Sequence, residues 1–265
     1  MIEIIWKPEL HSFNSCQEFA DEFRLCETDL ILTNEYIYKP FIEKLELPCG
    51  RIYQEKFGLG EPTDTMTQAI LDEAAKGNYD RVIAIGGGTV IDIAKVLVLG
   101  GGATVDELYG NMVGLTKARR LIIIPTTCGT GSEVTLVAVV ADTHKHAKLS
   151  FTSYKLVPHV AILDPALTSS LPPKLTATTG MDALTHAVEA HTSIQKNPVS
   201  DAFAAKAVEL IAANLPTACR NGADTEARTS LALASLMAGA AFSNAMVGIV
   251  HAIGHSLGGL CRIPH

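Results

Sequence analysis

The stretch RVIAIGGGTVIDIAKVLVL at residues 81–99 decides the fold. Its opening run, RVIAI, is short and β-branched, which is typical of a buried strand, and the glycines that follow predict a turn. From Thr89 to Leu99 the apolar residues have helical spacing. A strand that passes through a glycine turn into a helix is the repeating unit of a parallel sheet with helices on its faces.

The same rhythm extends to both sides of this stretch. DLILT at 29–33 and LIIIP at 121–125 predict two more short buried strands, and residues 65–76 predict a helix before the central strand. Around residues 163–173 the composition shifts to proline, serine and threonine. The first part of the chain is therefore expected to be an α/β structure.

Beyond this shift the pattern is only helical. The chain is rich in alanine and has apolar residues at i, i+3 and i+4 in three stretches, at 178–193, at 200–213 and from Arg228 onward. We therefore predict an α/β domain over residues 1–165 and an all-α domain over residues 166–265.

Composition narrows the class of protein. Of the 265 residues, 48% are hydrophobic and 18% are charged, which excludes a disordered chain, and the net charge of -7 offers no basic surface for nucleic acid or anionic lipid. The six cysteines form no CxxC pair, and the opening residues MIEIIWKPEL lack the apolar core of a signal peptide. We expect reduced thiols, a cytoplasmic location and small-molecule chemistry.

One uncharged stretch is long enough to cross a bilayer. Residues 229–261 contain no Asp, Glu, Lys or Arg. The stretch is built on alanine, glycine and serine and includes Asn244 and two histidines, a composition that suits close helix packing better than membrane insertion. We predict a buried helix of a globular protein here.

Two turns rich in glycine and threonine are candidates for holding a cofactor. GGGT at 86–89 lies between a strand and a helix, where backbone N–H groups can approach a pyrophosphate. It departs from the G-x-G-x-x-G pattern, since Ile91 stands where the last glycine belongs, and a plain tight turn explains it equally well. PTTCGTGSE at 125–133 follows the next predicted strand, so both turns should face one crevice, and its threonine hydroxyls could donate to phosphate or ribose.

Acidic and histidine side chains recur at helical spacing in the second half. Asp182 and His186 are four residues apart, as are His251 and His255, so each pair lies on one helical face, and His265 follows them. One carboxylate and several imidazoles suit Fe(II) or Zn(II). A lone histidine in such a helix is more often a core residue, but several without partners in apolar segments would be costly.

Three other histidines lie in a polar connection. They are predicted to be solvated, and they are His144, His146 and His159.

Four motifs together resemble the iron-containing (group III) alcohol dehydrogenases. They are GGGTVIDIAK at 86–95, PTTCGTGSEVT at 125–135, LPPKLTATTGMDALTHAVEAHTS at 171–193 and GIVHAIGHSLGGLCRIPH at 248–265. The resemblance implies an N-terminal α/β dinucleotide-binding domain, a C-terminal all-α metal-binding domain, and hydride transfer between NAD(H) and an alcohol. It also implies a homodimer or larger homo-oligomer. Relatives continue beyond the last motif, which implies a truncated helical domain and leaves open a catalytically silent fragment.

The resemblance assigns roles to individual residues. The implied metal ligands, for Fe2+ or alternatively Zn2+, are Asp182, His186, His251 and His265, and the implied proton-relay residue is His255. The implied cofactor-binding residues are Gly87, Gly88, Thr89 and Asp92 at the pyrophosphate, Thr126, Thr127 and Thr130 along the cofactor, and Lys148 near the nicotinamide ribose.

Cofactor choice depends on the end of the predicted strand 29–33. The family often has an aspartate there that selects NAD, whereas this chain has Asn34 and Glu35. Because Glu35 could hold a ribose hydroxyl, NAD is expected, with NADP as the alternative.

Segments outside the catalytic motifs bear on the substrate. TNEYIYKP at 33–40, LPC at 47–49 and QEKFGLGEPTD at 54–64 look most like 4-hydroxybutyrate dehydrogenases, which interconvert 4-hydroxybutyrate and succinate semialdehyde. Arg262 is the candidate partner of the substrate carboxylate, although an exposed loop arginine is as good an interpretation. Other iron-type enzymes, acting on butanol, propanediol or lactaldehyde, remain alternatives. A zinc-dependent glycerol-type dehydrogenase and a dehydroquinate synthase-like lyase share the architecture, but the motifs favour them less than the iron group.

Overall fold

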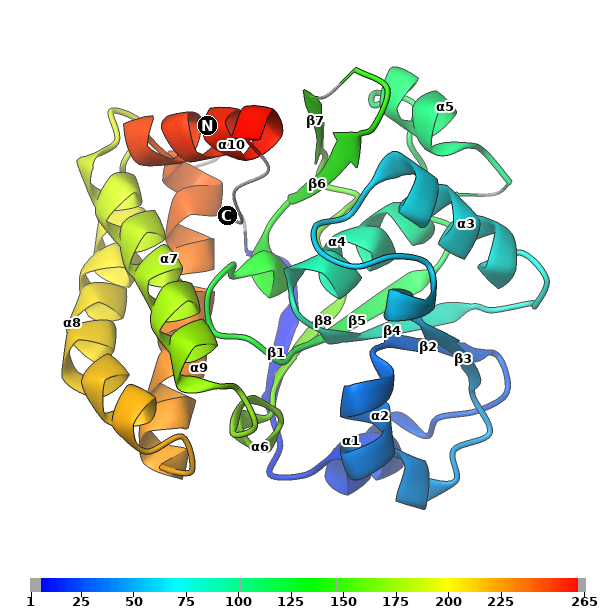
Figure 1. Ribbon diagram of the computed structural model, residues 1–265, viewed down its shortest axis with the longest axis horizontal. Coiled ribbons are helices and arrows are strands. Elements are labelled where there is room, and N and C mark those ends of the chain that lie inside the picture. The colour runs from blue at the N-terminus through cyan, green and yellow to red at the C-terminus, as the bar shows by residue number, and fades with distance from the viewer. Residues whose placement is uncertain (1–5, 101, 146, 262–265) are drawn as a thin grey trace.

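The protein divides into an α/β part and a bundle of helices that lie side by side (Figure 1). The computed structural model describes residues 6–100, 102–145 and 147–261, with side chains up to residue 258. The predicted Arg262 and His265, and the predicted solvated His146, lie outside the described residues.

A six-stranded parallel sheet forms the centre of the α/β part. Its strand order is β1-β8-β5-β4-β2-β3. The strands are β1 (Glu9–Ser12), β2 (Asp29–Thr33), β3 (Gly50–Tyr53), β4 (Arg81–Gly86), β5 (Arg120–Pro125) and β8 (Val160–Leu163). The three strands predicted from sequence are confirmed as β2, β4 and β5, which lie next to one another in the sheet.

Both faces of the sheet are buried. Alternate residues of each strand enter different cores, so that Leu30 and Leu32 of β2 pack on one face while Ile31 packs on the other. This explains why the strands read as continuous apolar runs instead of alternating patterns.

Helices cover the two faces. The described α/β helices are α1 (Cys16–Phe23), α2 (Glu35–Phe41), α3 (Asp64–Ala74), α4 (Gly88–Leu97) and α5 (Val105–Gly110), with 3-10 turns η1 (Glu43–Leu45), η2 (Gln54–Lys56) and η3 (Ser132–Val134). An antiparallel hairpin, β6 (Val137–Asp142) and β7 (Ala147–Thr152), lies on the side of α4. Figure 1 shows α3 and α4 above the sheet and α1 and α2 below it.

The second part consists of helices. They are α6 (Pro165–Thr168), α7 (Pro173–Thr192), α8 (Pro198–Arg220), α9 (Thr225–Ala245) and α10 (Ile249–Cys261). The predicted helices at 178–193 and 200–213 are confirmed and are longer than predicted. Helix α8 begins earlier because Asn197 and Ser200 form a capping box and Pro198 occupies the first turn. Alanines fill the contacts between α7, α8 and α9, which lets the three helices pack closely.

The buried helix predicted over residues 229–261 is confirmed for α9 and is wrong beyond Ala245. Helix α9 ends at Ala245, Met246 takes a left-handed φ of 67°, and α10 then runs at 100° to α9. Helix α9 is largely buried, whereas α10 leaves Ile249 73% exposed and Ile253 53% exposed. Among the described residues no single helix is long and apolar enough to cross a membrane, although α9 and α10 taken together as a bent pair meet those criteria.

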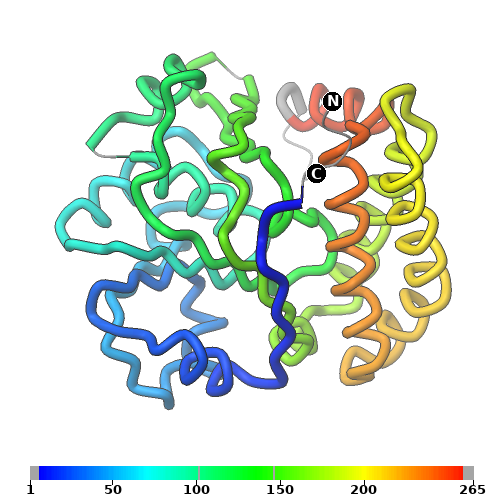
Figure 2. The backbone as a smooth tube through the Cα atoms, turned by 180° about the vertical axis from the view of Figure 1, so that it is seen from behind, coloured from blue at the N-terminus to red at the C-terminus, as the bar shows by residue number. Residues whose placement is uncertain are grey.

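A close backbone approach joins the two parts. Gly131 has a φ of +58°, and a Cβ added to it would lie 2.6 Å from the Cα of Gly239 on α9. Trp6, which precedes β1, stacks on Phe203 of α8 with ring centroids 5.8 Å apart. Figure 2 shows this N-terminal segment running alongside the helices. The turn after β5 is thereby held against the helical part.

The solvated state predicted for His159 is wrong, whereas His144 is exposed as predicted. His159 is half-buried, and the backbone N–H of Leu121 donates to its Nδ1 at 3.0 Å. Burial, together with the charges of Lys117, Arg120 and Lys7, lowers the pKa of His159 to about 4. The polar composition around this histidine hid its position at the start of β8.

This histidine should make stability depend on pH. Because the folded protein lowers the pKa of His159 from 6.5 to about 4, its contribution is fully present above pH 6.5 and is lost as pH falls through 4. His159→Asn keeps an acceptor near the Leu121 N–H but cannot titrate. In denaturant titrations the wild type should lose stability relative to His159→Asn between pH 6.5 and 4. A difference that stays constant over this range would contradict the assignment, and His144→Asn serves as the exposed control.

Candidate metal and cofactor site

Three predicted ligands meet between α7 and α10. Asp182 and His186 lie one turn apart on α7, and His251 lies in the first turn of α10. Asp182 Oδ1 is 3.8 Å from His186 Nδ1 and 3.5 Å from His251 Nε2. One ligand atom from each of the three residues lies within 4.8 Å of the other two.

The cluster is largely buried and lies against an aromatic ring. Both histidines are buried, and Asp182 is half-buried. The ring of His186 stacks between Phe242, at 4.4 Å, and His251, at 4.3 Å between centroids. One carboxylate oxygen and two imidazole nitrogens that converge between two helices form a donor set suited to Fe(II) or Zn(II). The residues present therefore fit a divalent metal ion.

A buried carboxylate that the sequence reasoning missed lies next to the cluster. Glu189 of α7 is 6% exposed and contacts Nδ1 of His251 with Oε2. Burial lowers the pKa of His251, but hydrogen bonds and charges from Asp182 and Glu189 outweigh it and the pKa is raised. The pKa of Glu189 is lowered overall. Burial alone would raise it, but hydrogen bonds donated by Gly248, His251 and Val250 have the larger effect.

The predicted proton-relay residue lies beside the cluster. His255 is half-buried one turn beyond His251, with their ring centroids 6.0 Å apart. The role of His255 stays a prediction, as do those of Arg262 and His265 outside the described residues.

The two predicted cofactor turns pack against each other. Strand β4 ends at Gly86, whose carbonyl accepts from the N–H of Thr126 at 3.0 Å. A Cβ on Gly87 would lie 3.3 Å from the methyl carbon of Thr127, and one on Gly88 3.1 Å from that of Thr130. The glycines therefore let the two turns pack closely, and helix α4 begins at this point.

The second turn also contacts α7, the helix that carries the predicted ligands Asp182 and His186. A Cβ on Gly129 would lie 2.8 Å from the Cβ of Thr179 on α7, and Asp182 follows Thr179 by one helical turn. The predicted cofactor turns and the predicted ligands are therefore adjacent.

Two further predicted cofactor residues have partners from one loop. Thr89 Oγ1 donates to the carbonyl of Gly60 at 2.9 Å, and Lys148 Nζ on β7 pairs with Glu61 Oε2 at 2.9 Å. The loop that carries Gly60 and Glu61 thus lies beside the start of α4 and β7. Helix α10 also contacts β7.

The predicted cofactor residue Asp92 connects three segments of the α/β part. Its carboxylate accepts from Ser132 Oγ at 2.9 Å and from the Val139 N–H at 3.0 Å, so it ties α4 to the second turn and β6. Burial raises its pKa. A role at the pyrophosphate stays a prediction, and the structure gives Asp92 a positioning role.

Lys95 is a buried residue that the sequence reasoning did not single out. Its Nζ donates to Ser132 Oγ at 2.8 Å, Thr135 Oγ1 at 2.8 Å and the Val137 carbonyl at 2.7 Å. Burial lowers the pKa of Lys95 to about 8. Glu133 lies in the same buried region, and burial raises its pKa to about 7. A lysine among the apolar residues of α4 was the available signal.

The residues that bear on cofactor choice lie at the end of β2. Asn34 Nδ2 donates to Gln54 Oε1 at 3.1 Å and Glu55 Oε2 at 3.0 Å, so it joins β2 to η2. Glu35 lies in the first turn of α2 and pairs with Lys39 at 3.0 Å. The carboxylate is therefore placed beyond the carboxyl end of a central strand, where ligands of such sheets bind.

Comparisons with known sequences agree with this geometry. The family described as iron-containing alcohol dehydrogenase matches residues 11–165, and the C-terminal part of the Fe-containing alcohol dehydrogenase family matches residues 176–265. The chain is 42% identical over 260 residues to 4-hydroxybutyrate dehydrogenase of Clostridium kluyveri, covering 97% of this chain and 70% of that protein. It is 41% identical over 207 residues to NAD-dependent methanol dehydrogenase of Bacillus methanolicus, and the match covers 77% of this chain and 54% of that protein.

Solved structures give the same result. Sulfoacetaldehyde reductase from Bifidobacterium kashiwanohense in complex with NAD+ has a TM-score of 0.89 at 28% identity, with 100% of this chain and 73% of that chain covered. A 1,3-propanediol oxidoreductase has a TM-score of 0.86 at 31% identity, with 100% of this chain and 72% of that chain covered. The predicted fold, an α/β part followed by a helical part that spans only a portion of its relatives, is confirmed. The chain belongs to the iron-containing alcohol dehydrogenase family.

Proposed function

We propose that this chain transfers hydride between NAD(H) and a primary alcohol or aldehyde at a metal centre. The observation that carries the proposal is the convergence of Asp182, His186 and His251 next to the two glycine-rich turns. Membership of a family of alcohol dehydrogenases, which act on CH–OH groups, supports the same reaction.

The metal would be held by Asp182, His186 and His251, with His265 as the fourth ligand. The family favours Fe2+, and Zn2+ suits the same donors. When bound, such an ion acts as a Lewis acid that lowers the pKa of an alcohol and polarises an aldehyde carbonyl. The ring of Phe242 stacks on His186, and an apolar neighbour of this kind strengthens electrostatic interactions at the site.

The cofactor would bind along the two turns. Backbone N–H groups at Gly87, Gly88 and Thr89, at the start of α4, would hold the pyrophosphate. Thr126, Thr127 and Thr130 would line the cofactor, and Lys148 would hold the nicotinamide ribose. A carboxylate at Glu35 suits the ribose hydroxyls of NAD and repels the extra phosphate of NADP. The NAD+ complex of the similar sulfoacetaldehyde reductase supports this choice.

His255 would move the proton of the reaction. Its imidazole lies beside His251 and is half-buried, and a neutral imidazole nitrogen can accept the hydroxyl proton of an alcohol near neutral pH. In the reverse direction the same nitrogen returns the proton to the alcohol oxygen.

The proposed substrates are 4-hydroxybutyrate and succinate semialdehyde. The 42% identity to the clostridial 4-hydroxybutyrate dehydrogenase supports them, and Arg262 would bind the distal carboxylate. An uncharged alcohol substrate is the second candidate, because the chain is also similar to a methanol dehydrogenase and a 1,3-propanediol oxidoreductase. We also propose a cytoplasmic location and a homodimeric or larger assembly, which follow from composition and family.

A comparison of two substrates tests this proposal. The Fe2+-loaded chain should reduce NAD+ with 4-hydroxybutyrate at a higher kcat/KM than with 1-butanol. Arg262→Ala should raise KM for 4-hydroxybutyrate roughly 10- to 100-fold, since a charged hydrogen bond is lost, and should leave KM for 1-butanol nearly unchanged. Equal effects on both substrates would remove the role of Arg262. A chain that binds no metal and turns over no alcohol would be the silent fragment.

A further inference from the structure

We propose that Glu189 is a positioning residue that anchors α10 on α7 and orients His251 toward the metal. The inference rests on the proposed metal centre. The proposed ligands within the described residues come from two helices, α7 and the more exposed α10, and Glu189 connects the two without being a ligand itself.

Glu189 shares a helical face with two proposed ligands. Asp182, His186 and Glu189 occupy positions i, i+4 and i+7 of α7, so their side chains lie on the same side of the helix. Glu189 is 6% exposed, although glutamate is seldom buried without a partner. Its position on this face and its burial indicate that the carboxylate has specific partners nearby.

Both carboxylate oxygens of Glu189 are used by the start of α10. Oε1 accepts from the N–H of Val250 at 2.6 Å, and Oε2 contacts Nδ1 of His251. The first backbone N–H groups of a helix lack partners within the helix and favour a negative charge. One side chain of α7 therefore fixes both the backbone of α10 and the ring that α10 delivers.

The contact selects one tautomer of His251. A carboxylate only accepts hydrogen bonds, so Nδ1 carries a proton toward Glu189, and Nε2 would offer its lone pair to a bound ion. Nε2 is the atom that lies 3.5 Å from Asp182 Oδ1, on the side of the proposed ion. Carboxylates of this kind fix the orientation of metal-binding histidines and raise their basicity.

Helix α10 needs such an anchor because much of it faces solvent. It follows a sharp turn at Met246, and Ile249, Val250, Ile253 and Leu257 are each at least 45% exposed. Its most extensive described contacts are with α7 and β7. Without Glu189, the position of His251 relative to the two ligands on α7 would be less well determined.

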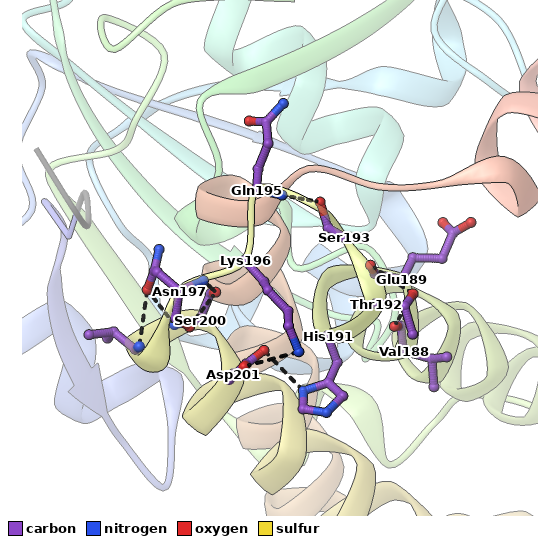
Figure 3. A network of polar contacts seen from close by, with 11 residues as sticks. Val188, Glu189, His191, Thr192, Ser193, Gln195, Lys196, Asn197, Ser200 and Asp201 are labelled. Atoms are coloured by element: carbon purple, nitrogen blue, oxygen red, sulfur yellow. Dashed lines mark hydrogen bonds and ion pairs between the residues drawn. The ribbon is translucent and has the colours of Figure 1, made fainter.

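A nearby carboxylate provides the matched control. Figure 3 shows the Glu189 side chain directed away from the His191–Asp201–Lys196 group. Asp201 pairs with His191 at 3.1 Å and Lys196 at 3.4 Å, and it takes no part in the proposed site. Asp201→Asn therefore makes the same chemical change in an ion pair that does not concern the metal.

The decisive variant is Glu189→Gln. The glutamine oxygen can still accept from the Val250 N–H, but its amide donates to His251 Nδ1 and so moves the ring proton to Nε2, the atom required by the metal. We expect the metal-free melting temperature to stay near that of the wild type. In calorimetric titrations with Zn2+ the dissociation constant should rise about 10- to 100-fold, the usual effect of losing such a partner. Asp201→Asn should bind Zn2+ as the wild type does.

Further measurements separate orientation from anchoring. Glu189→Ala removes both contacts and should speed hydrogen exchange at the start of α10, whereas Glu189→Gln should leave it largely unchanged. Equal Zn2+ affinity of Glu189→Gln and the wild type would overturn the proposal. If the wild type binds no metal, the proposed function fails, and 15N shifts of the His251 ring still judge the orientation. A protonated Nδ1 in the wild type and an unprotonated Nδ1 in Glu189→Gln would support it, and the same state of Nδ1 in both proteins would overturn it.

Discussion

Replacing Asp182 with asparagine should lower kcat/KM of the Fe2+-loaded chain for its alcohol substrate by about 10³-fold or more. The reason is that both histidine nitrogens of the cluster approach one oxygen of Asp182. An amide brings no negative charge, so the metal would be held weakly, and Lewis-acid stabilisation worth several kcal/mol would be lost. Steady-state assays with NAD+ and measurement of bound iron check this prediction.

Asp201→Asn is the matched change for this test also. Asp201 is a partly buried carboxylate of α8 that pairs with His191 and Lys196, so its loss tests general damage to the helical part. We expect it to retain nearly full activity and metal content. If both variants lose activity to the same extent, or if Asp182→Asn keeps its metal, the cluster is not the metal centre.

Lys95→Met should destabilise the protein by about 3–5 kcal/mol, measured as the free energy of unfolding in urea. The methionine retains the apolar chain but leaves Ser132, Thr135 and the Val137 carbonyl without their buried donor. It also removes the positive charge that lies near the buried carboxyl groups of Asp92 and Glu133.

The same change should weaken NAD+ binding, because Lys95 holds the segment that continues the second glycine-rich turn. The control is Lys206→Met, since Lys206 is exposed on α8 and pairs only with Glu209 among its described partners. An exposed pair of this kind contributes little, and the control should change stability by no more than about 0.5 kcal/mol. A loss below about 1 kcal/mol in Lys95→Met would show that the network is not important for stability.

The strands of the central sheet that are buried on both faces could be predicted from the sequence. β2, β4 and β5 have continuous apolar runs, and each ends at a turn. The edge strand β1 has the sequence ELHS and is mostly exposed, so it carries no periodic signal. β8 is apolar but only four residues long, which is too short to distinguish from a loop. Pairing across the sheet, not local pattern, makes these segments strands.

The break between α9 and α10 could not be predicted from the local sequence. Turns with a positive φ are usually marked by glycine, whereas here the residue is Met246. No proline or charge interrupts the stretch, so one continuous helix was the natural prediction. Tertiary packing, including the contact of Glu189 with the start of α10, determines the bend.

The residues of the proposed metal site could be singled out from the sequence, whereas the buried residues that hold them in place could not. Asp182, His186 and His251 were recognised because imidazoles at helical spacing are unusual in apolar segments. Glu189 follows His186 by three residues on the same face, and this spacing was the signal that would have identified it. Buried charges such as Lys95 resemble surface residues in a sequence until the structure shows their partners.

The most direct test of the metal centre is the number of divalent ions bound per chain. Wild type and His251→Ala would be loaded with Fe2+ without oxygen, freed of excess ion by gel filtration, and measured by inductively coupled plasma mass spectrometry. The account predicts about one ion per chain in the wild type and almost none in His251→Ala, because His251 supplies the ligand from α10. No bound ion in the wild type, or equal amounts in both proteins, would contradict it.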